Sequence, residues 1–446
     1  MKITLTGDSL FSSRNLNKRI EKNICSFLQE SDAVFTNAEF CTPKNQTAPA
    51  AGRGYVSAVR ENRLDELTKL GFHLVNFANN HTGDFGVQGI MDTIHAAEAR
   101  DIDPIGLGRS LDEANQPRFL DTESGRVAVV AASATRSEIF RASNGGNGVP
   151  ARPGLNPLRW EQTYVVPAAD FDNLKKINNR LGLSESIDVG TEIERWEPLP
   201  SDEIYVGSMY QDKIHFKKGK DYQVRTTLNL ADAAALIKQV RDAKNRANFT
   251  IFSLHTHEGL NENWYADKPA DFVREIARQA IDAGADVVIG HGAHFLRGIE
   301  LYHGKPIFYN LGSFLMEFEA GESIIPPKMY EAYQLPDSSL PSVLHRKRAY
   351  NNGKLAGFNS KRIFSAGLAL QIDFVDGKAE YRLLPLDLQM DAPDSLKRGI
   401  PKIASKDFTA KTIQRMQMLS NSFETKVSFE YKNGKLNKVD YFNASN

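Results

Sequence analysis

Acidic, amide and imidazole side chains recur directly after the short apolar runs of this chain. They are Asp8, Glu39, Asn80 with His81, His255 with His257, and His291 with His294. Carboxylate, amide and imidazole groups all bind divalent cations, and a mixed oxygen and nitrogen set suits manganese, iron or zinc. Four of the ten histidines fall between residues 255 and 294. The residue types and their positions therefore predict a divalent metal site.

The apolar runs before these side chains are predicted to be β-strands that alternate with helices. The runs span residues 2–6, 33–36, 72–78, 249–254 and 286–290. Between them, apolar residues recur at helical spacing, as in 64–70 and 272–281, and a glycine follows each segment within three residues. Such alternation predicts a sheet buried between helices, and ligands of these sheets bind beyond the carboxyl ends of the strands. We therefore expect the metal site at one edge of the sheet.

Two segments interrupt the alternation of strands and helices. Residues 141–225 contain a Gly-Gly pair and several prolines, and they are predicted to be a loop-rich insertion in a main domain that spans 1–320. Residues 321–446 are predicted to begin as an irregular linker and to end as a small α+β appendix packed on the main domain. The chain is thus expected to have one large domain and a small addition.

Composition and charge exclude several classes of protein. Lysine plus arginine and aspartate plus glutamate both number 55, so the formal net charge is zero, which argues against a dedicated nucleic-acid-binding protein. The apolar stretches fall well short of the roughly 20 residues that a membrane-spanning helix needs. The first residues lack the basic and then apolar pattern of a signal peptide, and the two cysteines have no metal-binding spacing. We therefore expect a cytoplasmic protein without an integral membrane segment.

Four stretches of the sequence resemble motifs of the CapA-type proteins, named for poly-γ-glutamate capsule synthesis. Residues 79–86 (NNHTGDFG) are similar to the family's A-N-N-H-x-x-D-[FY]-G motif, and 289–300 to its V-I-G-H-x-x-H stretch. Residues 307–314 resemble its Y-S-L-G-N-F block, and 32–39 resemble its A-D-x-x-x-x-N-x-E segment. The resemblance covers residues 1–320 and is specific because the motifs occur together.

The resemblance implies a calcineurin-like metallophosphatase fold, a layered α/β sandwich of mixed sheets flanked by helices, with a small α+β C-terminal appendix. Matched residue by residue, it implies these metal ligands: Asp8, Glu39, Asn80, His255, His291 and His294. It also implies that His81 donates a proton beside the metal, and that His257 and Glu258 act as acid/base or supporting groups. Leu10 stands where dinuclear phosphatases have a histidine ligand, so the resemblance implies one or two ions of manganese, zinc or iron.

A metal-dependent hydrolase is the function that these residues predict. A divalent ion lowers the pKa of its bound water toward 7 and polarises the attacked phosphoryl or carbonyl group. Four arginines are expected to hold an anionic substrate, such as a phosphoester, a γ-glutamyl peptide or polyglutamate: Arg14, Arg53, Arg109 and Arg297. The alternatives are a non-catalytic binding protein of a polyglutamate or envelope pathway, and a metal-dependent peptide epimerase that uses the same site.

Overall fold

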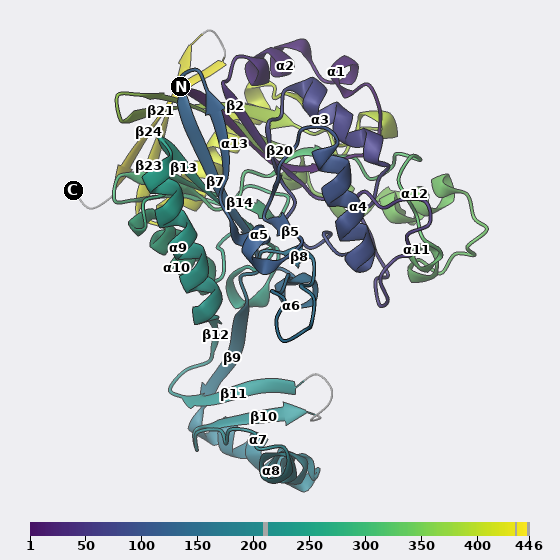
Figure 1. Ribbon diagram of the computed structural model, residues 1–446, viewed down its shortest axis with the longest axis vertical. Coiled ribbons are helices and arrows are strands. Elements are labelled where there is room, and N and C mark those ends of the chain that lie inside the picture. Colours follow the sequence, from purple (N-terminus) through teal and green to yellow (C-terminus); the bar gives the residue numbers. More distant parts are fainter. Residues whose placement is uncertain (208–212, 433–434, 444–446) are drawn as a thin grey trace.

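The apolar runs of the sequence lie in two β-sheets of the computed structural model (Figure 1). The structure describes residues 1–207, 213–432 and 435–443. One sheet has eight strands and the other six, and they pack face to face with helices on their outer faces. Both sheets contain parallel and antiparallel pairs. The predicted layered α/β sandwich of mixed sheets flanked by helices is confirmed.

The first sheet has the order β22-β21-β20-β1-β2-β3-β4, and β17 also pairs with β1. Its strands are β1 (Lys2–Leu10), β2 (Ala33–Ala38), β3 (Leu74–Asn76), β4 (Pro104–Ile105), β17 (Ser313–Met316), β20 (Ala366–Val375), β21 (Lys378–Asp387) and β22 (Lys402–Ile403). Its outer face is covered by α1 (Leu16–Arg19), α2 (Lys22–Gln29), α3 (Leu64–Leu70) and α4 (Gly86–Glu98). A 3₁₀ turn, Glu61–Arg63, leads into α3.

The second sheet has the order β15-β16-β14-β13-β7-β6. Its strands are β6 (Arg118–Thr122), β7 (Gly125–Ser133), β13 (Phe249–Thr256), β14 (Val287–Gly292), β15 (Ile299–Tyr302) and β16 (Lys305–Phe308). Helices α9 (Leu230–Arg246) and α10 (Asp271–Asp282) lie on its outer face. Shorter elements nearby are β5 (Leu107–Gly108), α5 (Leu111–Asn115), α6 (Ser137–Phe140), β8 (Gly154–Leu155) and the 3₁₀ turn Leu260–Glu262.

The core lies in three apolar layers because alternate residues of each strand face opposite ways. Val127 and Val129 of β7 pack in the layer between the sheets, whereas Ala128 and Val130 pack in the layer under α9 and α10. Strands buried on both faces need apolar residues at nearly every position, so they appear in the sequence as continuous apolar runs.

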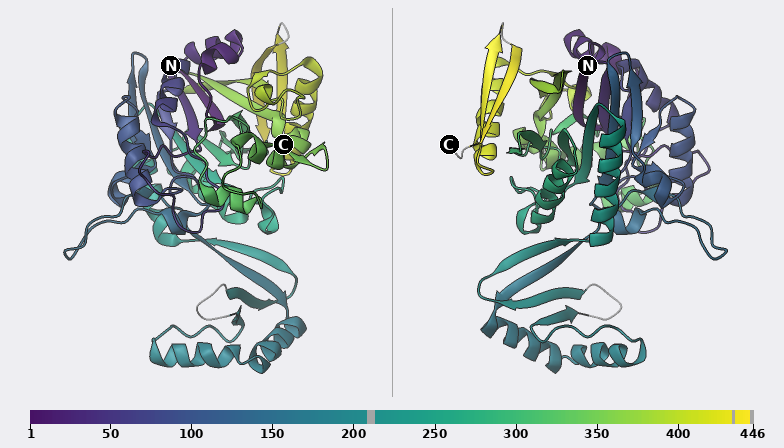
Figure 2. Two further views of the ribbon diagram at one scale, coloured as in Figure 1. Left: turned by 90° about the vertical axis from the view of Figure 1, so that its right-hand side faces the viewer. Right: turned by 60° about the vertical axis from the view of Figure 1, so that its left-hand side comes forward.

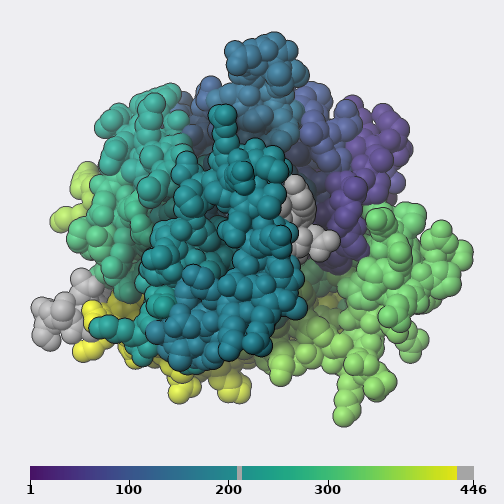
Figure 3. Space-filling model, turned by 90° about the horizontal axis from the view of Figure 1, so that it is seen from below, coloured from purple at the N-terminus to yellow at the C-terminus, as the bar shows by residue number. Residues whose placement is uncertain are grey.

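A lobe formed by residues 160–207 and 213–228 projects from the body (Figures 1 and 2). Its elements are β9 (Trp160–Pro167), α7 (Ala168–Arg180), α8 (Leu183–Ile193), β10 (Glu203–Gly207), β11 (Lys213–Gly219) and β12 (Gln223–Leu228), with the sheet order β10-β11-β9-β12. Figure 3 shows the lobe in front of the body when the molecule is seen from below. The expected loop-rich character of 141–225 is therefore wrong for this part. Strands exposed on one face, such as β12, carry polar residues at alternate positions and lack a continuous apolar run.

The C-terminal third contributes to the first sheet and also adds separate elements. Strand β20 pairs antiparallel with β1, with Lys2 opposite Asp373. The remaining elements are α11 (Pro327–Ala332), α12 (Pro341–Ala349), β18 (Tyr350–Asn351), β19 (Lys354–Leu355), α13 (Lys406–Asn421), β23 (Thr425–Lys432), β24 (Lys435–Asn443) and the 3₁₀ turns Gly357–Ser360, Arg362–Ser365 and Ser395–Lys397. Helix α13 with the β23–β24 hairpin forms a small α+β addition, and the domain boundary at residue 320 stays a prediction. Within the described residues, every helix is too short or too polar to cross a membrane.

Glu300 connects the edge of the second sheet to α10. Its side chain is 2% exposed and accepts hydrogen bonds from Arg274 at 2.9 Å, from Arg278 at 3.0 Å and from the hydroxyl of Tyr309. Burial alone would raise the pKa of Glu300, but the three donors hold this pKa below its ordinary value. The carboxylate is therefore stabilised in its charged form by the fold.

We expect Glu300→Gln to lower the free energy of unfolding by about 2 kcal/mol at pH 7, because an amide replaces a charged acceptor of hydrogen bonds. The folded pKa lies below the unfolded one, so this contribution is present above the unfolded pKa of about 4.3 and is lost as the pH falls through the folded value. Urea unfolding of both proteins at a series of pH values measures the difference. The exposed Glu275 of α10 gives the control, Glu275→Gln. A difference that stays constant at acidic pH would contradict the assignment.

Candidate metal centre

The carboxyl ends of strands from both sheets meet at one edge of the sandwich, and polar side chains are buried there. In the first sheet, Asp8 of β1 is in register with Asn37 of β2. In the second sheet, His255 of β13 is in register with His291 of β14. Each of these four residues has a relative exposure of zero. Parallel pairing thus brings groups that are far apart in the sequence to one place, as expected from the strand ends.

Asp8 is the best-satisfied carboxylate of this cluster. It accepts hydrogen bonds from the Asn37 amide at 2.8 Å and from the backbone N–H of Gly292 at 2.9 Å. Nδ1 of His294 lies 3.2 Å from its Oδ2, and Nδ1 of His291 lies 3.7 Å from its Oδ1. Burial would raise the pKa of Asp8, but the His294 hydrogen bond and the neighbouring imidazoles hold this pKa well below its ordinary value. Asp8 is therefore ionised and available as a ligand.

The loop after β14 needs an unusual backbone to direct its groups at Asp8. Gly292 has a φ of 101°, and a Cβ atom built there would lie 3.1 Å from the ring of His255. Glycine is therefore required both by the backbone angle and by the close ring. His294 also lies in the left-handed region, with a φ of 61°. Such backbone strain is characteristic of functional sites.

Glu39, which follows β2, is a buried carboxylate whose oxygens accept no hydrogen bond from the residues that the structure describes. Its Oε1 lies 3.6 Å from Nε2 of His294 and 3.9 Å from Nε2 of both His255 and His257. Neither of its oxygens has a hydrogen-bond partner in the described part of the chain. Burial, with the charges of Asp8 and Asp84, raises the pKa of Glu39 well above its ordinary value. An unpaired buried carboxylate is costly, and a cation between Glu39 and the imidazoles would remove that cost.

The imidazoles around Glu39 are suited to bind a metal. Burial lowers the pKa of His255 to about 3 and the pKa of His291 to about 4, and it lowers the pKa of His257 well below its ordinary value. These rings are therefore neutral at pH 7, which is the form that binds metals. Both ring nitrogens of His291, and Nε2 of His257, have no hydrogen-bond partner among the described residues. His255 is held by Asn80, whose Oδ1 lies 2.9 Å from its Nε2.

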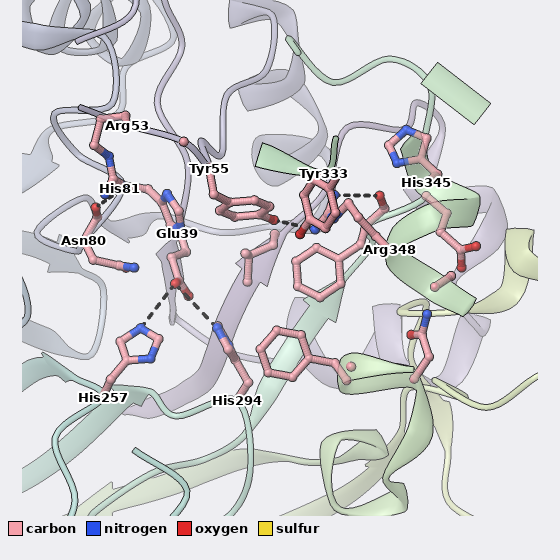
Figure 4. A pocket seen from close by; sticks show the side chains of 18 of the residues that line it. Glu39, Arg53, Tyr55, Asn80, His81, His257, His294, Tyr333, His345 and Arg348 are labelled. Carbon is pink, nitrogen blue, oxygen red and sulfur yellow. Dashed lines mark hydrogen bonds and ion pairs between the residues drawn. The ribbon is translucent and has the colours of Figure 1, made fainter. Parts of the chain in front are cut away.

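Two groups of three side chains place their ligand atoms within 4.8 Å of one another. One is Asp8, Glu39 and His255, and the other is Glu39, His257 and His294. Because Glu39 belongs to both, the arrangement fits one or two divalent ions. Figure 4 shows Glu39 between His257 and His294. His257 was expected to be an acid/base or supporting group, but its position favours a ligand. It comes two residues after His255, just past the end of β13, and side chains two residues apart along a strand point to the same side.

His81 lies beside this cluster with one ring nitrogen fixed. Its Nδ1 lies 2.7 Å from Oδ2 of Asp84, and Asp84 also accepts a hydrogen bond from Nε of Arg53 at 2.8 Å. A carboxylate can only accept, so Nδ1 carries the proton of the neutral ring and Nε2 is left to take up or release another. His81 and Asn80 both line the pocket that opens above the cluster. This position agrees with the expected role of His81 as a proton donor.

The pocket has a volume of about 390 Å³ and lies between two walls (Figure 4). The metal cluster forms one wall through Glu39, Asn80, His81, His257 and His294. Residues from the segment 318–359 form the opposite wall, and they include Phe318, Tyr333, Arg348 and Phe358. The cluster is therefore open to a ligand on one side.

The four arginines expected to hold substrate have different surroundings. Arg53 lines the pocket. Arg14 pairs with Glu322 at 3.3 Å, and Arg109 pairs with Glu98 and Glu113 at 2.7 Å each, and neither arginine is part of the pocket lining. Those two expectations are not supported, because surface carboxylates hold both guanidinium groups elsewhere. Two other arginines, Arg136 and Arg348, do line the pocket, although the sequence analysis did not select them.

Arg297 and Glu258 support the site from behind the pocket. The buried Arg297 donates hydrogen bonds to the backbone carbonyls of His257 at 3.0 Å and of Glu258 at 3.1 Å. Glu258 accepts hydrogen bonds from the hydroxyls of Thr135 at 2.6 Å and of Thr256 at 2.7 Å. Neither side chain lines the pocket. Both residues therefore position the segment that carries His257, and the expected substrate contact of Arg297 is not supported.

Comparisons with known protein sequences agree with the four motifs found in the sequence. The family model for bacterial capsule synthesis protein PGA_cap matches residues 2–317. An uncharacterized protein of Sinorhizobium fredii, y4sH, is 31% identical over 422 residues, which are 92% of this chain and 87% of that protein. The PGA biosynthesis protein CapA of Bacillus subtilis is 22% identical over 307 residues, which are 67% of this chain and 58% of CapA. Among solved structures, a novel phosphatase from Mycoplasma pneumoniae aligns over 89% of this chain and 96% of its own, with 12% identity and a TM-score of 0.36.

We expect His291→Ala to bind at least one divalent ion fewer than the wild-type protein. The reason is that the two buried ring nitrogens of His291 have no hydrogen-bond partner among the described residues. His303→Ala is the control, since the His303 side chain is 69% exposed and pairs with Asp282 at 3.2 Å. Elemental analysis of both variants, purified without chelator, gives the metal content. Equal metal content in the two folded variants would overturn the ligand assignment.

Proposed function

The chain belongs to the bacterial capsule synthesis protein family PGA_cap, and from this premise we propose that it is a metal-dependent hydrolase of an anionic phosphoester or γ-glutamyl amide. Membership confirms the resemblance to CapA-type proteins that the four sequence motifs indicate. The proposal depends on one observation. The buried Glu39 carboxylate has no hydrogen bond among the described residues, and it lies at a pocket that His81 also lines.

Seven side chains would hold one or two divalent ions: Asp8, Glu39, Asn80, His255, His257, His291 and His294. A divalent ion supplies an activated water and polarises the attacked group. Glu39, Asn80, His257 and His294 all line the pocket, so the cluster faces it with several of its ligands. Catalytic metal sites keep a position open for water or substrate, whereas structural sites are closed. This favours a hydrolase over a binding protein with a purely structural metal.

His81 would protonate the leaving group from Nε2. Asp84 holds Nδ1 of His81, and Arg53 and the backbone N–H of Ser57 hold Asp84 in turn. The ring can therefore change its protonation at Nε2 without turning away from the pocket. General acid catalysis by a positioned side chain contributes typically 10²–10⁴-fold to the rate.

The lining of the pocket supports an anionic substrate. Arg53, Arg136 and Arg348 all contribute to it. The Bacillus subtilis relative is named as a PGA biosynthesis protein, and we extend to this chain the proposal that a glutamyl-containing anion is among its substrates. Phosphoesters are the second class of proposed substrate. The same arginines can bind a phosphoryl group, and a metal ion can activate it in the same way.

Hydrolysis assays with added manganese or zinc test the proposed function. We expect turnover of simple phosphomonoesters or of γ-glutamyl peptides by the metal-loaded protein, and loss of turnover after chelation. If protein shown to hold metal turns over neither class, the hydrolase proposal is refuted.

We expect His81→Asn to lower kcat about 10²–10⁴-fold for alkyl phosphates, because their leaving groups need a proton. The loss should be smaller for 4-nitrophenyl phosphate, whose leaving group is stable as an anion. Metal content should stay unchanged, since His81 is assigned as a proton donor and not as a ligand. His303→Asn serves as the control. An equal loss with both leaving groups, or a loss of metal, would contradict the role of His81.

A further inference from the structure

Arg348 is held rigidly in the wall opposite the metal cluster. It lies in the last turn of α12, and its guanidinium carbon is 4.7 Å from the ring centroid of Tyr55, 5.2 Å from that of Phe318 and 6.0 Å from that of Tyr333. One of its nitrogens donates a hydrogen bond to the Tyr55 hydroxyl at 2.7 Å (Figure 4). Cation–π contacts on several rings fix the plane of the guanidinium before any ligand arrives.

The charge of Arg348 has no carboxylate partner within 4 Å among the residues that the structure describes. The three glutamates of residues 317–322 form ion pairs with other arginines. Glu317 pairs with Arg19 at 2.8 Å, Glu319 pairs with Arg398 at 2.8 Å, and Glu322 pairs with Arg63 and Arg14. Arg348 therefore presents an uncompensated positive charge to the pocket that it lines.

Tyr55 connects Arg348 to the proton donor. Its ring centroid lies 5.8 Å from that of His81, and its hydroxyl accepts the hydrogen bond of Arg348. The proposed donor of the leaving-group proton and the uncompensated guanidinium thus lie at opposite ends of one tyrosine side chain. A substrate bound at the metal cluster with its leaving group at His81 would therefore extend along Tyr55 toward Arg348.

We propose that Arg348 forms a subsite for a second oxyanion, a carboxylate or phosphate, on the leaving-group side of the substrate. The subsite rests on the proposed function and narrows it from any anionic ester or amide to substrates with two anionic ends. A guanidinium fork recognises either oxyanion through two parallel hydrogen bonds. The buried Asn359 and His345 also line this pocket and would add polar groups for such a ligand.

Binding of phosphonates that the enzyme cannot hydrolyse tests this subsite. Calorimetry on the manganese-loaded protein compares ω-phosphonocarboxylic acids of increasing chain length with alkylphosphonates of equal length and with alkane bisphosphonates. We expect the phosphonocarboxylate of one chain length to bind at least about tenfold tighter than the alkylphosphonate of the same length, since charge-assisted hydrogen bonds are strong when partly buried. A bisphosphonate that gains as much or more also supports the subsite and identifies its anion as phosphate.

Arg348→Gln should remove this gain, so that the phosphonocarboxylate binds the variant no more tightly than the alkylphosphonate of equal length does. Arg346→Gln is the matched control, because Arg346 is exposed on the same helix and does not line this pocket. Arg348→Lys keeps the charge without the fork and should retain part of the gain. If the glutamine variant fails to fold, the lysine variant tests the subsite by itself.

Two results would overturn the subsite: no gain at any chain length in the wild-type protein, or the same gain in folded Arg348→Gln or Arg348→Lys. A purely structural role, in which the cation only stabilises the end of α12, predicts a lower melting temperature without a change in this gain. If the phosphonocarboxylate binds more tightly but no ester or amide is turned over, the hydrolase proposal is refuted and the proposed subsite is still supported.

Discussion

Two carboxylates share one buried cluster of imidazoles, and the balance of charge in that cluster governs the rest of the site. Asp8 is satisfied by an amide, a backbone N–H and an imidazole, whereas Glu39 has no hydrogen bond among the described residues. Two buried negative charges repel each other, and neutral imidazoles cannot offset them. A bound cation would resolve this conflict, and it would explain why otherwise unsatisfied groups are kept at the strand ends.

The parallel strands and the meeting of their polar end residues at one place could be predicted from the sequence, but other parts could not. Runs such as 249–254 and 286–290 are apolar because both faces of their strands are buried, so the polar residues after them stand out. The pairing of β20 with β1 joins residues more than 360 positions apart and leaves no local signal. Nothing near Arg14 or Arg348 in the sequence distinguishes a surface ion pair from a pocket cation, because the difference depends on distant segments that pack against each arginine.

The two walls of the pocket come from different parts of the chain. The metal wall lies within residues 2–317, which the family model matches. The opposite wall begins at Phe318 and includes Tyr333, Arg348 and Phe358. The proposed ligands thus lie in the part that the family model matches, and the proposed subsite of Arg348 lies beyond that part. Members of one family can in this way keep the same metal chemistry and accept different molecules.

The lobe enters and leaves the body through two paired strands. Trp160 at the start of β9 is opposite Leu228 at the end of β12, and Trp160 stacks on Phe272 of α10 with ring centroids 5.0 Å apart. Neighbouring strands are about 5 Å apart, so the two points of attachment are adjacent. The lobe can therefore be lengthened, shortened or replaced at a single junction without disturbing the register of the strands that carry the buried polar cluster.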